Sequence, residues 1–372
     1  MRTIEKTPYF SKTIGKLPKG CQLCVEGAKM VLYVTGICNN NCAYCPLSAS
    51  RKKDRMWADE WPVDNIEEMT EECRLIDAKG CGITGGDPLV RLDRTVECIK
   101  HLKKVFGKDF HIHLYTPLLL VTEEKLERLY NAGLDEIRFH PDFDNDKDWN
   151  KITFAKKYDW DIGIEIPVFP DRVTKTKEMI DAVKSNITFV NLNELEISET
   201  NAEKLYDAGY SVKDDGSYAV VGCDVAAKKI MEHVAKNTKL KCHYCSLKLK
   251  DKVQLANRLK RRAENVALEG DYTTDEGLLF RGAVYAKEPS FASDFNFTAD
   301  DEKLLDKCKK ELIDEFDVPV ELLVIDKIRG RLLTSVQVVS ELSKEIKSTK
   351  CIPTTVIEYP TYDAMIVELE KL

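Results

Sequence analysis

Three cysteines stand close together in the stretch CNNNCAYCP, as Cys38, Cys42 and Cys45. The stretch directly follows residues 29–35, an apolar run that predicts a β-strand. Cysteine thiolates hold iron–sulfur clusters, and a [4Fe–4S] cluster normally takes four of them. Three thiolates on one loop therefore leave one iron open to a substrate or cofactor. Zinc is the alternative metal, and it needs a fourth ligand to close its tetrahedron.

Four of the 13 cysteines form two C-x-x-C pairs, Cys21 with Cys24 and Cys242 with Cys245. In a reducing compartment such pairs are more often metal ligands than disulfides. Together they predict an auxiliary site for zinc or for a second [4Fe–4S] cluster, and the sequence does not discriminate between the two metals. His243 or Cys223 could replace one thiolate. The single cysteines are expected to be small buried hydrophobes.

Short apolar runs alternate with amphipathic helical stretches, which predicts six βα units and a parallel sheet. The expected strands are residues 29–35, 80–84, 110–116, 135–140, 161–167 and 189–195. Several of these strands have one apolar face and one polar face, whereas a strand covered by helices on both faces would be apolar throughout. A sheet that curls around a polar, ligand-filled lumen explains the difference. We expect Arg138, His140 and Glu165 on that inner face.

The cysteine triplet resembles the hallmark of the radical S-adenosylmethionine (SAM) superfamily, C-x-x-x-C-x-Φ-C, in which Φ is aromatic and corresponds here to Tyr44. The resemblance implies a partial (βα)6 TIM-like barrel in which Cys38, Cys42 and Cys45 hold a [4Fe–4S] cluster. It also implies that SAM binds the open iron and is cleaved to methionine and a 5′-deoxyadenosyl radical, which abstracts hydrogen from a substrate.

A second match lies in ITGGDPL, where Gly85, Gly86 and Asp87 correspond to the turn that holds the methionine amino group of SAM in this superfamily. Asp87 replaces the usual glutamate and is one methylene shorter. The resemblance further implies that Tyr44 lies against the adenine and that three residues contact the ribose or carboxylate of SAM, namely Arg138, His140 and Glu165. The implied reductant is of the ferredoxin or flavodoxin type.

The net charge of −7 and the apolar fraction of 43% argue against a disordered chain and against an overall basic nucleic-acid binder. We found no signal peptide and no apolar run long enough to span a membrane, so we expect a cytoplasmic, oxygen-sensitive protein. The expected organisation is an N-terminal segment (1–28), the barrel (29–200), a region with the second cysteine pair and a basic helix (201–276), and a small C-terminal α/β segment (277–372).

Three functions compete at this stage. The first is a radical SAM enzyme with an auxiliary metal that modifies RNA such as tRNA, a peptide or a cofactor precursor. Its RNA version depends on seven Lys and Arg residues between 248 and 262, which could follow a phosphate backbone. The second is an enzyme that installs a glycyl radical on a partner protein, as the resemblance to an archaeal group related to pyruvate formate-lyase activating enzymes implies. The third is a zinc-binding scaffold or nucleic-acid module.

Overall fold

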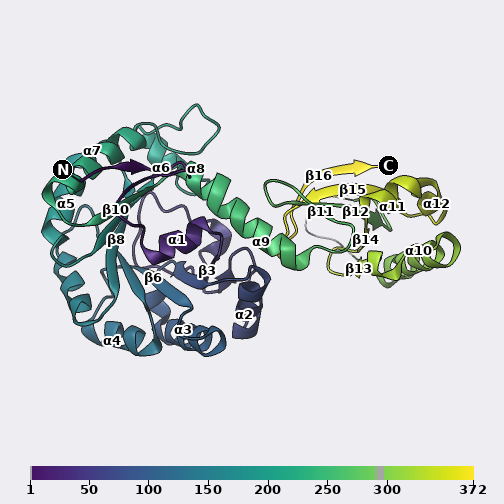
Figure 1. Cartoon of the computed structure of the whole chain (residues 1–372), viewed down its shortest axis with the longest axis horizontal. Coiled ribbons are helices and arrows are strands. Elements are labelled where there is room, and N and C mark those ends of the chain that lie inside the picture. The colour runs from purple at the N-terminus through teal and green to yellow at the C-terminus, as the bar shows by residue number, and fades with distance from the viewer. Residues whose placement is uncertain (1, 290, 292–296) are drawn as a thin grey trace. The chain divides into compact units, whose positions relative to one another are not determined.

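The fold is described by a computed structural model that covers residues 2–289, 291 and 297–372 (Figure 1). Contacts divide the chain into two compact units, unit 1 up to Leu255 and unit 2 from Ala256 to Leu372. Within the described residues, no helix is both long and apolar enough to cross a membrane. Each unit is built around a sheet of its own.

Unit 1 contains a ten-stranded sheet in its described residues, in the order β1-β2-β10-β9-β8-β7-β6-β5-β3-β4. Its parallel strands are β3 (Lys29–Thr35), β5 (Gly80–Gly85), β6 (His111–Pro117), β7 (Glu136–His140), β8 (Asp161–Val168), β9 (Phe189–Glu194) and β10 (Lys241–Cys245). Antiparallel strands extend both edges: β1 (Glu5–Lys6), β2 (Lys12–Ile14) and β4 (Trp57–Ala58). The six predicted strands are confirmed, and β10 adds a seventh parallel strand to the described sheet.

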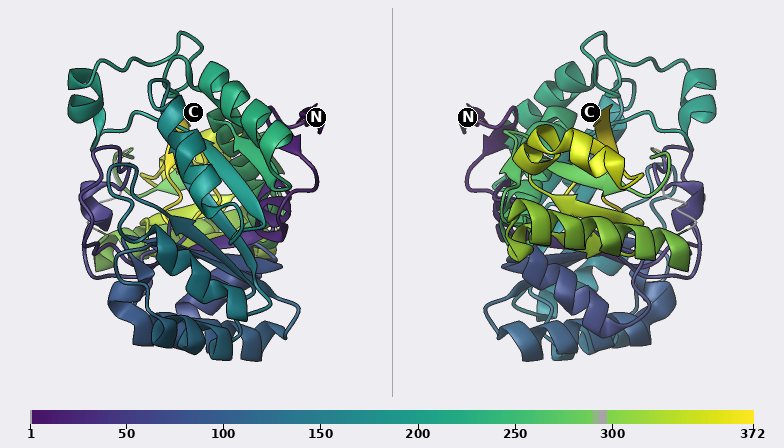
Figure 2. Two further views of the ribbon diagram at one scale, coloured as in Figure 1. Left: turned by 90° about the vertical axis from the view of Figure 1, so that its left-hand side faces the viewer. Right: turned by 90° about the vertical axis from the view of Figure 1, so that its right-hand side faces the viewer.

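Helices cover the outside of the parallel sheet, and one short helix lies within its arc (Figure 1). The outer helices are α2 (Ile66–Leu75), α3 (Leu92–Phe106), α4 (Glu123–Ala132), α5 (Val173–Val183) and α7 (Cys223–Asn237). The left view of Figure 2 shows this helical exterior of unit 1. The inner helix is α1 (Lys19–Val25), whose Leu23 and Gly20 lie against β5, β6 and β7. This helix fills part of the lumen.

The two faces of the strands carry different side chains, as expected. Ile112, Ile137 and Ile164 point outward into the core shared with the helices. His113 and Arg138 point inward and are buried, with 0% and 1% of their surface exposed. The parallel sheet is therefore a partial barrel with a polar lumen, in agreement with the predicted fold class.

Shorter elements complete unit 1. They are η1 (Ala49–Arg51), η2 (Pro88–Arg91), η3 (Trp149–Lys157), α6 (Ala202–Asp207), α8 (Leu247–Leu249) and the π-helical η4 (Lys250–Leu255). The basic stretch that we predicted as one long helix thus contains a π-helical segment before α9 (Ala256–Val266). A π turn adds one residue to a helical turn and changes which side chains share a face.

Unit 2 has an antiparallel sheet with helices on one face. Its described strands are β11 (Tyr272–Thr273), β12 (Leu279–Tyr285), β13 (Val324–Asp326), β14 (Arg331–Thr334), β15 (Ile352–Glu358) and β16 (Ile366–Lys371). The helices are α10 (Ala299–Phe316), η5 (Val320–Leu322), α11 (Val336–Glu341) and α12 (Ser343–Ser348). Leu305, Val339 and Ile346 pack from these helices onto Val284 and Leu332 of the sheet. The opposite face buries Arg331 against Glu358, with 2.6 Å between Nη1 and Oε2.

Candidate active site

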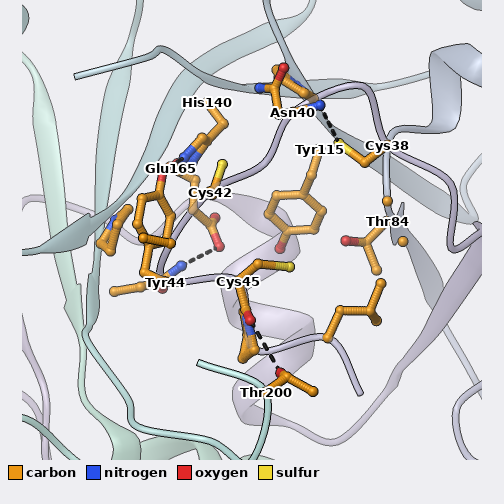
Figure 3. Close-up of a pocket in the computed structure, with 18 of the residues that line it drawn as sticks. Cys38, Asn40, Cys42, Tyr44, Cys45, Thr84, Tyr115, His140, Glu165 and Thr200 are labelled. Carbon is orange, nitrogen blue, oxygen red and sulfur yellow. Dashed lines mark hydrogen bonds between the residues drawn. The ribbon is translucent and has the colours of Figure 1, made fainter. Parts of the chain in front are cut away.

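A cavity of about 630 Å³ opens at the carboxyl ends of the parallel strands of unit 1 (Figure 3). Its walls come from the cysteine loop after β3, from the glycine turn after β5 and from the ends of β6 to β9. The volume is in the range of small-molecule and cofactor sites, which in parallel α/β sheets lie at this edge. Most of the residues that we predicted to bind SAM or the cluster meet here.

Cys38, Cys42 and Cys45 all line this cavity, and none of them forms a disulfide. Figure 3 shows their side chains around one opening. Burial raises the pKa of the Cys38 and Cys42 thiols above its ordinary value. No three His, Cys, Asp or Glu side chains in the described part of the chain already stand as a metal site. Three free thiols on one loop nevertheless fit the donor set of a [4Fe–4S] cluster with one open iron.

The cysteine loop is held from the segment that follows β9. Asn201 is buried, and its amide Nδ2 donates to the carbonyl oxygens of Tyr44 and Glu196, both at 3.1 Å. Thr200 donates its hydroxyl to the carbonyl of Cys45 at 3.3 Å. Neither residue was predicted from the sequence, because no local pattern shows that positions 155 to 157 residues apart in the chain are in contact.

The glycine turn fits against the start of the cysteine loop. The amide of Gly86 donates to the carbonyl of Thr35 at 2.8 Å, and that of Asp87 donates to the carbonyl of Ile37 at 2.9 Å. A Cβ added to Gly86 would lie 2.2 Å from the Ile37 carbonyl oxygen. At Gly85 the φ angle of +131° also disfavours any other residue. Both glycines line the cavity, so the turn leaves backbone exposed to a ligand.

Asp87 does not line the cavity. Its carboxylate Oδ1 accepts hydrogen bonds from the Leu89 amide at 3.0 Å and the Thr116 hydroxyl at 2.9 Å. These bonds cap η2 and tie it to β6. Burial raises the pKa of this carboxyl group above its ordinary value. The side chain thus supports the turn from behind, instead of facing the ligand.

Tyr44 and His140 form a hydrogen-bonded pair on the cavity wall. The Tyr44 hydroxyl lies 2.6 Å from Nε2 of His140, and Nδ1 of His140 lies 2.8 Å from the backbone carbonyl of Glu165. A carbonyl only accepts, so Nδ1 carries the proton and Nε2 accepts from Tyr44. Burial lowers the pKa of His140, which keeps the ring neutral. Phe169 packs edge-on against Tyr44, with ring centroids 5.2 Å apart.

Arg138 and Glu165 pair at the base of the cavity. Nη1 of Arg138 donates to Glu165 at 2.7 Å and to the Tyr115 hydroxyl at 3.2 Å, and the guanidinium also pairs with Glu136. Asn193 donates to the second oxygen of Glu165 at 2.9 Å. Desolvation opposes ionisation of Glu165, but Arg138 outweighs it, so that the pKa of Glu165 is lowered. The base of the cavity therefore carries charged side chains that pair with one another.

The two C-x-x-C pairs are placed differently from one another. Cys21 and Cys24 lie on α1, inside the arc of strands, and Cys245 packs beside α1 against Val25. Cys242 belongs to the outer core between sheet and helices, because residues three apart on a strand point to opposite faces. Burial raises the pKa of Cys21 to about 11 and that of Cys242 to about 12. Three of the four predicted auxiliary ligands are thus on the inner side of the sheet.

The basic stretch does not form one exposed phosphate track. Arg258 and Arg262 are buried within unit 2, where Arg262 donates to the Pro360 carbonyl. In unit 1, Lys248 pairs with Asp215 at 3.1 Å and Lys250 lines the cavity. Lys250 was not predicted as a cavity residue, because a regular helical pattern does not reveal a π turn.

The family model of the radical SAM superfamily matches residues 32–166. A protein of Methanocaldococcus jannaschii with the provisional name glycyl-radical enzyme activating enzyme is 38% identical over 383 residues, which cover 99% of this chain and 96% of that protein. The PqqA peptide cyclase of Bradyrhizobium diazoefficiens is 30% identical over 111 residues, 29% of this chain and 27% of the cyclase.

Among solved structures, Streptococcus suis SuiB bound to its precursor peptide SuiA matches 59% of this chain and 48% of its own, with 14% identity and a TM-score of 0.41. The near-complete match to the archaeal relative extends well beyond the residues that the family model covers. This chain is a member of the radical SAM superfamily, whose enzymes use a [4Fe–4S] cluster and SAM.

Proposed function

We propose that this radical SAM enzyme binds its cluster through Cys38, Cys42 and Cys45 and acts on a polypeptide. The observation that supports the site is that all three thiols and both glycines of the turn line one cavity. The chemistry supplied by the bound cofactors is one-electron cleavage of SAM to methionine and a 5′-deoxyadenosyl radical. A reductant of the ferredoxin or flavodoxin type would deliver the electron.

The residues of the chain then have distinct tasks. The backbone of Gly85 and Gly86 lies open for the methionine end of SAM, and Asp87 holds that turn in place through Leu89 and Thr116. The Tyr44 ring offers a surface for the adenine, fixed in orientation by His140. Arg138 pairs with both Glu165 and Glu136, so the Arg138 and Glu165 side chains are held in place and can orient polar groups in the cavity.

The choice of a polypeptide substrate depends on the relative from M. jannaschii, whose name describes an enzyme that acts on a glycyl-radical enzyme. A partner protein with a glycyl-radical loop is accordingly the substrate that we propose. The structure does not favour RNA, since four of the seven basic residues that suggested it are used in other ways: Arg258 and Arg262 are buried, Lys248 forms an ion pair and Lys250 lines the cavity.

The first experiment is anaerobic reconstitution of the protein with iron and sulfide, reduction in the presence of SAM, and detection of 5′-deoxyadenosine. Cys38→Ala should abolish the product, whereas Cys98→Ala, a buried cysteine on α3, should retain it. Formation of a glycyl-radical signal on a candidate partner protein would identify the substrate class. A chain that holds only zinc and leaves SAM intact would instead support the scaffold.

The same sample tests the auxiliary site, for which Cys21, Cys24 and Cys245 remain the candidates on the inner side of the sheet, whereas Cys242 faces the outer core. A count of about eight irons per chain indicates a second [4Fe–4S] cluster, and about four irons with one zinc indicates a zinc site. About four irons without zinc would remove the auxiliary site. The metal count is independent of turnover, so it remains informative if the substrate is unknown.

A further inference from the structure

Three lysines that the cofactor site does not explain line the cavity, namely Lys52, Lys204 and Lys250, and of these Lys250 is the one that is not exposed. Two acidic residues of the cavity wall, Glu165 and Glu194, are already hydrogen-bonded within the protein. Glu194, for example, accepts from Lys213 at 2.6 Å, from the Tyr244 hydroxyl at 2.7 Å and from the Leu247 amide at 2.8 Å. Such groups have little capacity left for a ligand.

Lys250 is different because its ammonium is only loosely paired. Among the described residues, its salt-bridge partner is Glu196, with 3.8 Å between Nζ and Oε2. That separation is too long for a hydrogen bond. The side chains of Lys250 and Glu196 are 29% and 30% exposed, and both residues line the cavity. Three N–H donors of Lys250 are thus close to a ligand space.

The local backbone structure places Lys250 at the cavity wall. Ser246 caps α8 by accepting from the Leu249 amide at 3.1 Å, and its own hydroxyl donates to the Phe10 carbonyl at 2.6 Å. The π-helical η4 begins at Lys250, directly after this anchored turn. π-helical turns are uncommon and occur frequently at functional sites. The next lysine, Lys252, is exposed and does not line the cavity.

The electrostatic surroundings define the ligand class. Desolvation alone would lower the pKa of Lys250, but the carboxylates of Glu196 and Glu165 help to outweigh it and the pKa is raised, so the ammonium stays charged. The same carboxylates repel a ligand with two negative charges more strongly than one with a single charge. A carboxylate therefore suits this position better than a phosphate dianion.

The carboxylate of SAM is expected at another part of the cavity wall. The glycine turn follows β5, whereas Lys250 follows β10, and β6, β7, β8 and β9 lie between them. Five steps between strands correspond to about 24 Å measured along the curved sheet, and the straight distance across the cavity is shorter. In SAM the amino group and the carboxylate share one carbon atom, so a methionine amino group at Gly85 and Gly86 keeps its carboxylate near β5.

We propose that Lys250 binds a carboxylate of the substrate, such as an acidic side chain of a polypeptide, and that Glu196 gives up its loose pairing when this ligand enters. This inference rests on the proposed function for the position of SAM. It deepens that function by naming a substrate group and the residue that positions it. Because the Lys250–Glu196 pair is loose, an acidic segment of a polypeptide is the substrate group that we match to this wall of the cavity.

The test uses the reconstituted, SAM-bound full chain with lysine labelled by nitrogen-15. Acetate is the probe, and the ammonium signal of Lys250 is assigned by its loss in Lys250→Met. We expect a saturable shift of this signal with acetate, and no such shift for the signal lost in Lys252→Met. Glu196→Gln should strengthen acetate binding about two- to fivefold, because it removes a partly exposed competing carboxylate.

Three results would overturn the inference. The first is the absence of a saturable shift of the Lys250 signal, and the second is saturation by inorganic phosphate without saturation by acetate. The third is a loss of SAM affinity of tenfold or more in Lys250→Met, which would show that the carboxylate bound by Lys250 is that of SAM. Glu196→Gln retains the lysine and keeps the test valid if Lys250→Met does not fold. Failure of the wild-type protein to form 5′-deoxyadenosine would contradict the proposed function alone.

Discussion

Gly86 has no room for a side chain, because the cysteine loop lies directly against it. In Gly86→Ala the new Cβ would lie 2.2 Å from the Ile37 carbonyl oxygen, a backbone atom that cannot move aside as a flexible side chain could. We expect a loss of about 1–3 kcal/mol in the free energy of unfolding of unit 1, as for other overpacked sites. The displaced loop should also hold fewer irons per chain. Denaturant unfolding and an iron assay measure the two effects.

A control for Gly86→Ala is available at Gly209, where an added Cβ would meet nothing within 4 Å. Its φ of +85° is left-handed, so Asn is the suitable replacement, since Asn tolerates that conformation. Gly209→Asn should leave the iron content unchanged. Equal iron losses in both variants would mean that the close approach at Gly86 does not position the cysteine loop.

Asp87 provides a second prediction for a single residue, because its carboxylate faces away from the cavity. In Asp87→Asn the side-chain oxygen can still accept from Leu89 and Thr116, which are its partners at 3.0 and 2.9 Å. We expect the dissociation constant of SAM to change by less than about twofold. Equilibrium dialysis with labelled SAM measures it. A tenfold or larger increase would show that the charge itself pairs with the cofactor.

At the scale of elements, the cysteine loop depends on a contact with the segment between β9 and α6. Asn201→Ala removes two bonds donated to carbonyls and one accepted from the Ser198 amide at 2.7 Å. Each buried bond contributes about 1 kcal/mol, so we expect iron loss to a chelator about tenfold faster or more. Thr200→Val loses one longer bond of 3.3 Å and should have a smaller effect. Similar rates in Asn201→Ala and the wild type would exclude this anchor.

The strands of the barrel were predictable, since short apolar runs alternate with helical stretches and several of the strands alternate apolar and polar residues with a period of two. Ile112, His113 and Leu114 illustrate the pattern, with the two apolar residues in the outer core and the histidine in the lumen. The same reasoning did not identify β10, because we interpreted its two cysteines as metal ligands instead of testing residues 241–245 for alternation. Contacts such as Asn201 with the cysteine loop depend on the closed shape of the sheet, which local patterns do not contain.

For the whole molecule, the histidines divide unequally between the two units. All six lie in unit 1, and burial lowers the pKa of His111 and His243 to about 4. His113 and His140 are shifted in the same direction. A buried neutral histidine takes up a proton only when the chain unfolds. Its contribution to stability is therefore complete above pH 6.5 and is lost as the pH falls from about 6.5 toward about 4.

Acid should consequently destabilise unit 1 before unit 2. Each shifted histidine contributes about 1.4 kcal/mol per pH unit to the slope in this window. All four tryptophans also lie in unit 1, so their fluorescence reports that unit alone, while far-UV circular dichroism reports both. In denaturant unfolding at decreasing pH, the midpoint of the fluorescence transition should move to lower denaturant concentration. The part of the dichroism transition that comes from unit 2 should stay at higher denaturant concentration. His243→Gln should reduce the slope of the free energy of unfolding of unit 1 against pH by the contribution of about one proton. Transitions that coincide at every pH would show that the two units unfold as one and would contradict the prediction.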